Sequence, residues 1–366
     1  MEDELLCRLA LQFQPNIGNA TIKKLLQYFG SAQAIFQNTK KDSVISRTLG
    51  RRVRLPVLSK ESLQFAEKEL KWMTDRHISL TLYIDDDFPK RLRNCSDSPF
   101  FFYYKGKNIF NEAKMVAMVG TRNASPYGKE ITKKIIEELK TYNVCIVSGL
   151  AKGIDAVAHQ QALENDLKTV AVMGAGLSTI YPECNRQLAR RIEADGSALI
   201  SEYPFKAKPD RQHFPQRNRI IAGMSDATIV IETASKGGSV ITAYIAQSYN
   251  RDVFAVPGNV NSKTSEGCHE LIRKNIAALV ASGKDVAEMM GWDLQPAKAV
   301  QRSLFVELSA EEQSLVDIIS QHPRIMIDEI IQSYSHYTPS QIASILLRLE
   351  LKGVIQCNPG KNYTIC

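Results

Sequence analysis

A short segment rich in cations and aromatic rings is the part of the chain whose residue types most clearly indicate chemistry. Cations that follow a phosphate backbone, together with rings on which bases stack, are typical of single-strand nucleic-acid binding. From residue 203 to 219 the chain carries five cations, one acid and three aromatic rings, namely Lys206, Lys208, Arg211, Arg217, Arg219, Asp210, Tyr203, Phe205 and Phe214. We expect Arg211, Phe214, Arg217 and Asn218 to contact a strand.

Arg219 is expected to differ from the other cations of this segment. It lies deeper in a helix that the sequence predicts to begin near Pro215. A cation buried in that way needs an acidic partner. We expect Arg219 to form an ion pair with Glu202 or Glu232.

A second group of candidates follows short apolar runs. Glycines let backbone amides approach a ligand closely, and helix N-termini add partial positive charge, so such positions bind phosphate. A single glycine is explained equally well by a tight turn, but several beside cations favour binding. The group consists of Gly120, Thr121, Arg122, Gly149, Lys152, Gly174, Gly176, Gly237, Gly238 and Ser239.

The elements that must position these residues form an α/β pattern from residue 115 onward. Short apolar runs with little polar alternation are separated by amphipathic stretches, which predicts a parallel sheet covered by helices on both faces. About seven strands make an extended Rossmann-like domain, and ligands of such sheets bind beyond the carboxyl ends of the strands. The runs are 116–120, 144–149, 169–176, 198–204, 227–234, 252–258 and 277–282, and 80–84 with 100–106 extend the sheet at an edge.

The flanking regions predict two further domains. Residues 1–75 show helical spacing, and 15–30 resembles half of a helix-hairpin-helix, although a plain hairpin capped by Gly30 fits better. Residues 309–366 predict three helices and a two-stranded hairpin, which is a winged-helix-like pattern. We therefore expect a helical (SAM- or helix-hairpin-helix-like) domain at 1–75, the Rossmann-like domain at 76–292, a linker at 293–308 and the winged helix at 309–366.

Composition narrows the class of protein. The 366 residues carry a net charge of +7, which permits an anionic partner without requiring one. Residues 1–110 carry 18 basic and 12 acidic groups, whereas 309–366 carry 4 and 6. The last segment is therefore the least suited to a polyanion, and protein docking or a structural role is favoured for it. No apolar run is long enough for a membrane span and the start does not resemble a signal peptide, so we expect a cytoplasmic protein.

Catalytic, metal and cofactor signals are weak. Seven scattered cysteines and six scattered histidines indicate neither disulfides nor a metal site. There is no GxGxxG after the third run and no GxxxxGK[ST], so neither a dinucleotide nor ATP is expected. Acids such as Asp155 and Glu232 lack a catalytic partner, and His159 is expected to be structural. The sequence predicts no cofactor and no enzyme activity.

These motifs together resemble the DNA-processing protein A family (DprA, also called Smf), whose members bind single-stranded DNA and load a recombinase in bacterial transformation. They occur in the family's order over about 140 residues, as VGTRNASPYG (119–128), VSGLAKGIDAVAHQQAL (147–163), VMGAGLSTIYPECN (172–185), ISEYP (200–204), FPQRNRIIAGMS (214–225), GGSVITA (237–243) and VFAVPG (253–258). The resemblance implies that Arg122, Arg211 and Phe214 line a strand-binding pocket. It also implies a homodimer through the Rossmann-like domain and hand-over of the strand to RecA.

Two positions depart from the family pattern. Lys152 stands where the family usually has Arg, which keeps the charge but loses the planar fork. His269 stands at the Asn of the family's Gly-Thr-Asn-x-Leu-Ile, which is GCHELI (267–272) in this chain.

An enzyme is the alternative reading. Lysine-decarboxylase-like phosphoribohydrolases share this kind of sheet and a Pro-Gly-Gly-x-Gly-Thr-x-x-Glu motif with a catalytic Glu. The match stops at Gly237-Gly238: Lys236 replaces the Pro, Val240 and Ile241 replace Gly-Thr, and Tyr244 stands where the Glu should be. A binding protein is therefore favoured.

Overall fold

The computed structural model describes residues 2–14, 17–38, 58–292, 308–322, 325–334, 337–358 and 362–365. The chain divides into two compact units, Met1–Trp292 and Asp293–Cys366. The expected linker, apart from Leu308, lies outside the described residues, as do Pro15 and Asn16 of the first helical hairpin and Pro359-Gly360 of the last hairpin turn.

A nine-stranded sheet forms the centre of the first unit, in the order β1-β2-β6-β5-β4-β3-β7-β8-β9. The seven strands from β3 to β9 run parallel, and the antiparallel pair β1 and β2 extends the sheet beside β6. The expected extended Rossmann-like sheet with an added edge is thereby confirmed. The strands are β1 (Ser79–Leu82), β2 (Phe101–Gly106), β3 (Met115–Val119), β4 (Cys145–Ser148), β5 (Thr169–Met173), β6 (Ala198–Ser201), β7 (Ala227–Val230), β8 (Asp252–Ala255) and β9 (Ala278–Leu279).

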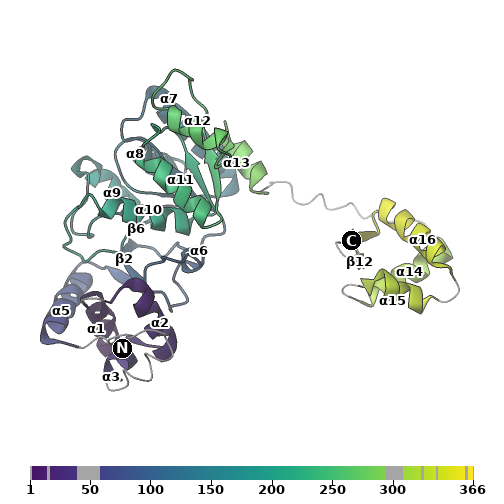
Figure 1. Cartoon of the computed structure of the whole chain (residues 1–366), viewed down its shortest axis with the longest axis horizontal. Coiled ribbons are helices and arrows are strands. Elements are labelled where there is room, and N and C mark those ends of the chain that lie inside the picture. The colour runs from purple at the N-terminus through teal and green to yellow at the C-terminus, as the bar shows by residue number, and fades with distance from the viewer. Residues whose placement is uncertain are drawn as a thin grey trace. The chain divides into compact units, whose positions relative to one another are not determined.

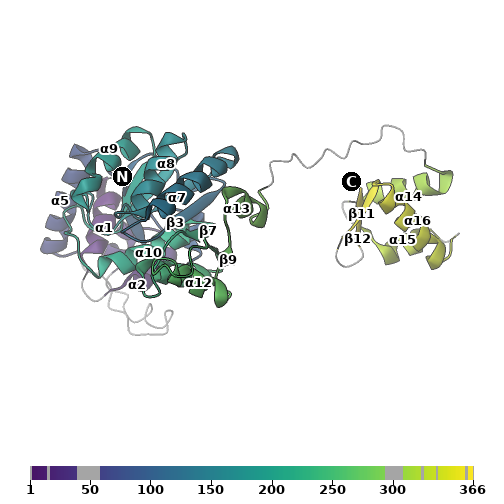
Figure 2. The same ribbon diagram turned by 90° about the horizontal axis from the view of Figure 1, so that it is seen from above.

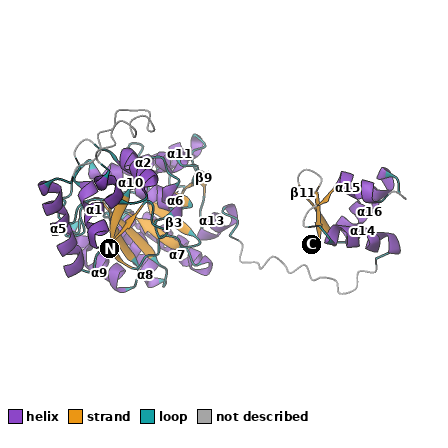
Figure 3. Ribbon diagram, turned by 90° about the horizontal axis from the view of Figure 1, so that it is seen from below, coloured by secondary structure: helices purple, strands orange, loops and turns teal. Residues whose placement is uncertain are grey.

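Helices cover both faces of this sheet, as Figures 2 and 3 show. One face carries α7 (Pro126–Leu139), α8 (Ile154–Glu164) and α9 (Arg186–Ala194), and the other carries α10 (His213–Met224), α11 (Gly238–Ser248) and α12 (Glu266–Arg273). Because both faces are covered, every residue of β3 is buried, which explains why its sequence shows no polar alternation. The shorter helices of this region are α6 (Lys90–Arg93), η2 (Lys140–Tyr142), η3 (Glu183–Asn185) and α13 (Gly283–Met289).

The order of the strands creates a switch point at β3. From β3 the chain moves outward through β4, β5 and β6, and then returns to place β7 on the other side of β3. The loops that follow β3 and β7 therefore leave the sheet in opposite directions. Such a point is where open α/β sheets bind ligands.

The N-terminal helices share a hydrophobic core with the edge of the sheet. They are α1 (Glu2–Gln12), α2 (Asn19–Phe29), α3 (Ala32–Gln37) and α5 (Lys60–Asp75), and in Figure 1 they lie together beside β2. Their core includes Leu82 of β1 and Phe101 and Tyr103 of β2. Gly30 ends α2 in the left-handed conformation with φ of 76°, as expected for a glycine cap.

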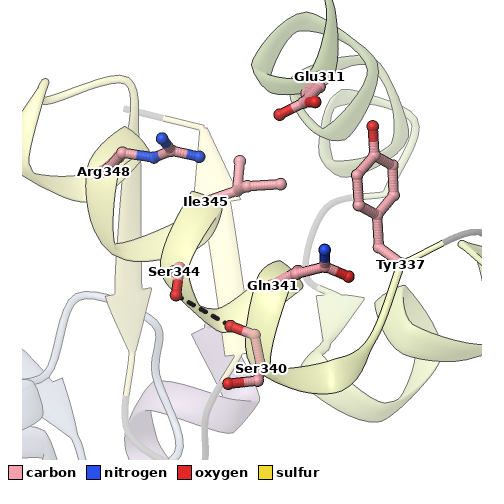
Figure 4. Close-up of a pocket in the computed structure, with 7 residues that line it drawn as sticks. All are labelled: Glu311, Tyr337, Ser340, Gln341, Ser344, Ile345 and Arg348. Atoms are coloured by element: carbon pink, nitrogen blue, oxygen red, sulfur yellow. Dashed lines mark hydrogen bonds between the residues drawn. The ribbon is translucent and has the colours of Figure 1, made fainter.

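The second unit is a winged helix. Its elements are α14 (Ala310–Ser320), β10 (Ile325–Met326), α15 (Ile327–Ser333), α16 (Pro339–Leu351), β11 (Ile355–Asn358) and β12 (Asn362–Ile365). Capping boxes begin α14 at Ser309 and α16 at Thr338, so both helix starts are set by local sequence. Figure 4 shows a shallow pocket of this unit, lined by Glu311, Tyr337, Ser340, Gln341, Ser344, Ile345 and Arg348.

Across the described parts of both units, the helices are too short or too polar for any of them to cross a bilayer.

The shared core of the N-terminal helices and the sheet edge leads to a stability prediction. Leu82 is fully buried in that core, so Leu82→Ala should lower the free energy of unfolding by about 2–5 kcal/mol. Because both parts pack on this side chain, they should lose stability in the same transition, measured by urea unfolding of the full chain with far-UV circular dichroism. An early unfolding transition confined to the N-terminal helices would contradict a shared core. The control is Leu347→Ala, at an exposed position of the second unit, which should leave this transition unchanged.

Candidate nucleic-acid interface

A buried arginine holds the carboxyl ends of two strands together. Arg217, on the second turn of α10, is 4% exposed, and its Nη1 donates to the carbonyl of Gly149 at 2.5 Å and to the carbonyl of Val172. Gly149 follows β4 and Val172 belongs to β5. Burial lowers the pKa of Arg217 to about 10, so the group is still charged at neutral pH. Arg217 therefore anchors the strand ends and does not present its charge to solvent. The direct strand contact expected of Arg217 from the sequence is wrong, because the packing of α10 on β4 and β5 buries this side chain.

The charge of Arg217 is balanced by Asp155 in the first turn of α8. Both groups are buried, and the Asp155 carboxylate accepts from the amide of Gly149 at 3.1 Å and from that of Ala151 at 3.4 Å. Burial raises the pKa of Asp155, and the nearby Arg217 opposes that rise. Asp155 therefore binds the N–H of Gly149, and Arg217 binds its carbonyl oxygen. Asp155 thus has a structural role, as the sequence indicated.

Two glycines make this close packing possible. A Cβ on Gly149 would lie 2.5 Å from Nη1 of Arg217, and a Cβ on Gly153 would lie 2.2 Å from the carbonyl oxygen of Thr121. Gly153 also has φ of 77°, which strains any residue with a side chain. The backbone after β4 therefore packs directly on the backbone after β3.

An exposed cation and two aromatic rings lie at the same edge. The guanidinium carbon of Arg122 lies 5.3 Å from the ring centre of Phe214, and the ring of Tyr181 lies 5.6 Å from that of Phe214. Phe214 is half-buried and packs against Gly174, where an added Cβ would lie 2.9 Å from the ring. We call Arg122, Phe214 and Tyr181 the switch-point cluster. It brings together residues that follow β3, β5 and β6.

Tyr181 was not among the residues selected from the sequence. Its side chain is exposed and belongs to the loop between β5 and α9. The sequence signal that could have identified Tyr181 is its position in the loop after β5, the same loop that contains Gly174. Tyr203 and His213 form a further stacked pair nearby in the sequence, with ring centres 3.9 Å apart.

The structure separates the remaining members of the basic segment. Lys152 and Arg211 are exposed, whereas Asn218 is half-buried and accepts from Nε of Arg217 at 3.2 Å. Arg219 pairs with Glu202 at 2.5 Å, which confirms the ion pair expected for it. Phe205 is 5% exposed and belongs to the core of the N-terminal helices, so it is no stacking surface beside Phe214.

The Gly237-Gly238-Ser239 turn lies on the other side of the switch point, at the start of α11 after β7. A Cβ on Gly237 would lie 2.2 Å from Oγ1 of Thr233, and Ser239 is buried. Gly238 has open space around it. The contacts of this turn therefore run to the Thr233 loop, on the side opposite to that of Gly149.

Two titratable groups that could suggest catalysis have structural partners. Glu232 is 2% exposed, and its carboxylate accepts from the amide of Ser125 at 3.0 Å and from its hydroxyl at 2.6 Å. His159 is fully buried with Nδ1 at 2.7 Å from the Thr169 hydroxyl, and burial lowers its pKa to about 3. A structural His159 was expected, although its Nε2 has no hydrogen-bond partner among the described residues.

Comparison with known protein families adds to this geometry. Residues 79–291 match the family model of DNA recombination-mediator protein A, and residues 296–361 match that of the DprA winged helix domain. The chain belongs to the DprA/Smf family. The resemblance found in the sequence motifs is thus confirmed, together with the winged helix of the second unit.

Relatives of the DprA/Smf family match over much of their length. The chain is 44% identical to DNA processing protein DprA of Streptococcus pneumoniae over 203 residues, covering 56% of this chain and 71% of that protein. It is 33% identical to protein Smf of Escherichia coli over 303 residues, covering 80% and 79%.

Two solved DprA structures resemble the fold. The X-ray structure of DprA from Streptococcus pneumoniae matches with a TM-score of 0.63 and 33% identity, covering 77% of this chain and 95% of that chain. DprA from Helicobacter pylori, described for its single-stranded DNA binding mode, matches with a TM-score of 0.53 and 29% identity, covering 58% and 95%.

The buried pair of Arg217 and Asp155 leads to a pH-dependent prediction. Arg217→Met should lower the free energy of unfolding by about 3–5 kcal/mol near pH 7, because it leaves a buried carboxylate without its cation. Without the guanidinium the pKa of Asp155 rises further, so the folded variant keeps a proton that the unfolded chain releases. The stability of the variant therefore falls as pH rises from about 4, the pKa of Asp in the unfolded chain, toward the raised pKa of the folded variant. The loss of unfolding free energy relative to the wild type should shrink as pH is lowered toward about 4.

Urea unfolding at about pH 7 and about pH 5 measures this effect. Arg217→Met with Asp155→Asn should recover part of the loss near pH 7. Arg186→Met removes an exposed ion pair with Glu183 and should cost no more than about 1 kcal/mol. An equal deficit of Arg217→Met at both pH values would show that Asp155 is not the unpaired charge.

Proposed function

We propose that this protein binds and protects single-stranded DNA through the switch-point cluster and helps to load the RecA recombinase on the strand, in natural transformation and recombination. The observation that supports it most directly is the guanidinium of Arg122 on the ring of Phe214, at the carboxyl ends of the sheet. This pair places a phosphate-binding charge directly beside a surface on which a base can stack.

Electrostatics favour a polyanion at this edge. Arg122, Lys152 and Arg211 are exposed, whereas Glu202 is paired with Arg219 and Glu232 accepts a hydrogen bond from Ser125. The charge of buried Arg217 is balanced by Asp155, so the exposed cations supply the positive charge of this edge. Binding that depends on such contacts weakens as salt rises, because counterions are released from the strand.

The aromatic part of the cluster favours single strands over duplexes. Bases in a duplex are already stacked on each other and paired, so they cannot lie on Phe214 or Tyr181 without being pulled out. Stacking accepts any base, so little sequence preference is expected. Membership of the DprA/Smf family and the description of the Helicobacter pylori relative as a single-strand binder support the same proposal.

The remaining parts of the proposal follow from the family. A homodimer through the Rossmann-like domain, hand-over of the strand to RecA and a cytoplasmic location are what the DprA resemblance implies for this chain. The second unit, with 4 basic and 6 acidic residues from 309 onward, suits protein docking better than DNA. Gly120, Gly238 and Ser239 remain proposed contacts through their backbone amides. The amides of Thr121 and Gly237 donate to the carbonyls of Glu232 and Ala234, at 2.7 and 2.9 Å, so these two residues are proposed to shape the site and not to bind phosphate through their amides.

A phosphoribohydrolase is the alternative function. Against it, Tyr244 stands at the position of the catalytic Glu, and the buried carboxylate of Glu232 is already bound by Ser125. We expect no release of ribose phosphate from nucleoside monophosphates by the purified protein, measured by chromatography of the products. Turnover that is lost on replacing Glu232 would instead favour the enzyme.

Charge and stacking in the cluster can be separated by salt titration. Arg122→Ala and Arg211→Ala should each remove about one phosphate contact, so the slope of log affinity against log salt should flatten by roughly 0.7 for single strands. Phe214→Ala should leave the slope nearly unchanged and cost on the order of 1–3 kcal/mol at every salt concentration. Fluorescence anisotropy of labelled thymidine oligonucleotides gives both quantities.

The controls address folding and specificity. Lys284→Ala removes an exposed cation of α13, far along the chain from the cluster, and should leave the salt slope unchanged. Duplex DNA of the same length should bind more weakly than the single strand. Wild-type salt slopes for both arginine variants, or equal affinity for duplex, would contradict the proposed interface.

A further inference from the structure

A further cation–aromatic pair, apart from the switch-point cluster, joins the loop after β6 to α5. The ammonium of Lys206 lies 4.3 Å from the ring centre of Trp72, which is the shortest cation–ring distance in the described part of the chain. Lys206 is exposed and Trp72 is half-buried on the last turn of α5. The pair repeats the chemistry of Arg122 and Phe214, because tryptophan is the strongest partner for a cation and a large surface for a base.

The loop that carries Lys206 is fixed to α5. The amide of Phe205 donates to the carboxylate of Glu69 at 2.9 Å, and Glu69 is 1% exposed. The ring of Phe205 lies 5.5 Å from that of Trp72 and carries the guanidinium of Arg76 at 5.2 Å. Burial raises the pKa of Glu69, whereas its hydrogen bonds with the Phe205 amide and the Tyr103 side chain oppose that rise. Because a buried carboxyl group needs these partners, Glu69 holds the loop on the helix.

The same loop is also fixed to the strand ends of the sheet. The amide of Gly176 donates to the carbonyl of Ala207 at 2.9 Å, and the amide of Ser178 donates to that of Phe205 at 3.0 Å. Gly174, just before, supports the ring of Phe214. The backbone from 204 to 207 therefore connects the Trp72 pair to the switch-point cluster without a mobile segment between them.

Distance and charge fit one continuous strand. From Lys206 to Arg211 the chain spans at most about 18 Å, and Lys208 between them is exposed. Lys68 lies one turn before Trp72 on the same face of α5 and is also exposed. Residues 206–211 carry three cations and one acid, and residues 67–76 carry three of each, so cations outnumber acids over the two segments together.

We propose that single-stranded DNA continues from the switch-point cluster along residues 206–211 to Trp72, which stacks on a further base while Lys206 binds a phosphate. This inference rests on the proposed function. It makes α5 part of the DNA-binding surface and extends the interface beyond the Rossmann-like sheet. Short strands fill the switch-point cluster alone, and only longer ones reach Trp72.

Tryptophan fluorescence tests the contact directly. The chain has two tryptophans, Trp72 and Trp292, so Trp292→Phe leaves Trp72 as the reporter. With a length series of thymidine oligonucleotides, the emission of Trp72 should change above a threshold length, and saturate with the same affinity that anisotropy of the labelled strand gives. Strands below the threshold should bind without changing the emission.

Variants of the second pair should show the same length dependence. Trp72→Leu should weaken binding of strands above the threshold about 5- to 150-fold and leave shorter strands unaffected, whereas Phe214→Ala should weaken both. Lys206→Ala should flatten the salt slope by roughly 0.7 for long strands only. Trp72→Phe keeps a ring and should retain most of the affinity. Tyr28→Leu, at an exposed aromatic position on α2, is the matched control and should change neither.

Each of three results would overturn this inference and leave the proposed function intact. The first is normal strand binding with unchanged Trp72 emission at every length. The second is wild-type affinity of Trp72→Leu for long strands. The third is an equal loss for short and long strands, because Trp72 would then act only by positioning the loop. Failure of the unaltered protein to bind any single strand would instead overturn the proposed function and this inference with it.

Discussion

The candidate interface depends on one buried guanidinium. Arg217 binds carbonyls that belong to the ends of β4 and β5, and Asp155 compensates its charge while holding the amides of the loop after β4. A buried charge is costly unless it is paired and fully hydrogen-bonded, so this arrangement admits few alternative backbone positions. The exposed groups of the switch-point cluster are therefore presented on a rigid edge, which lowers the entropy that binding must overcome.

The N-terminal helices extend this rigidity to the loop after β6. Their core includes residues of β1 and β2 as well as Phe205, and Glu69 binds the amide of that phenylalanine. A basic loop of this composition, left to itself, would lose considerable conformational entropy on binding a strand. Contacts with α5 on one side and with the 174–178 loop on the other remove most of that freedom beforehand.

Much of the fold followed from the sequence because buried parallel strands leave a simple signature. Each apolar run became one of the strands β3 to β9, although five of these strands end three or four residues before the run does, and the aromatic run 100–106 became part of the added edge. Which residues of the basic segment are buried and which are exposed was not predictable from the sequence in the same way. Arg217 and Arg211 are identical in type, and only the position of α10 against β4 and β5 buries one and exposes the other. Phe205 was misjudged for a related reason, since the helix that covers it is distant in sequence. Tyr181 lies outside the segment rich in cations, and only its ring contact with Phe214 makes it part of the switch-point cluster.

Arg122 already contacts the ring of Phe214 in the structure of the protein alone. The guanidinium lies over the ring on which, by the proposal, a base would stack. A nucleotide bound there would replace one favourable contact by another and would free the cation for phosphate. By this proposal, the stacking of a base on Phe214 and the binding of a phosphate by Arg122 would occur together. Truncating one residue removes a contact that the other makes in the free protein. A double-mutant cycle across Arg122 and Phe214 would therefore measure a coupling energy without a ligand as well as with one. In the structure, arginine thus takes the place on the ring that the proposal gives to a base.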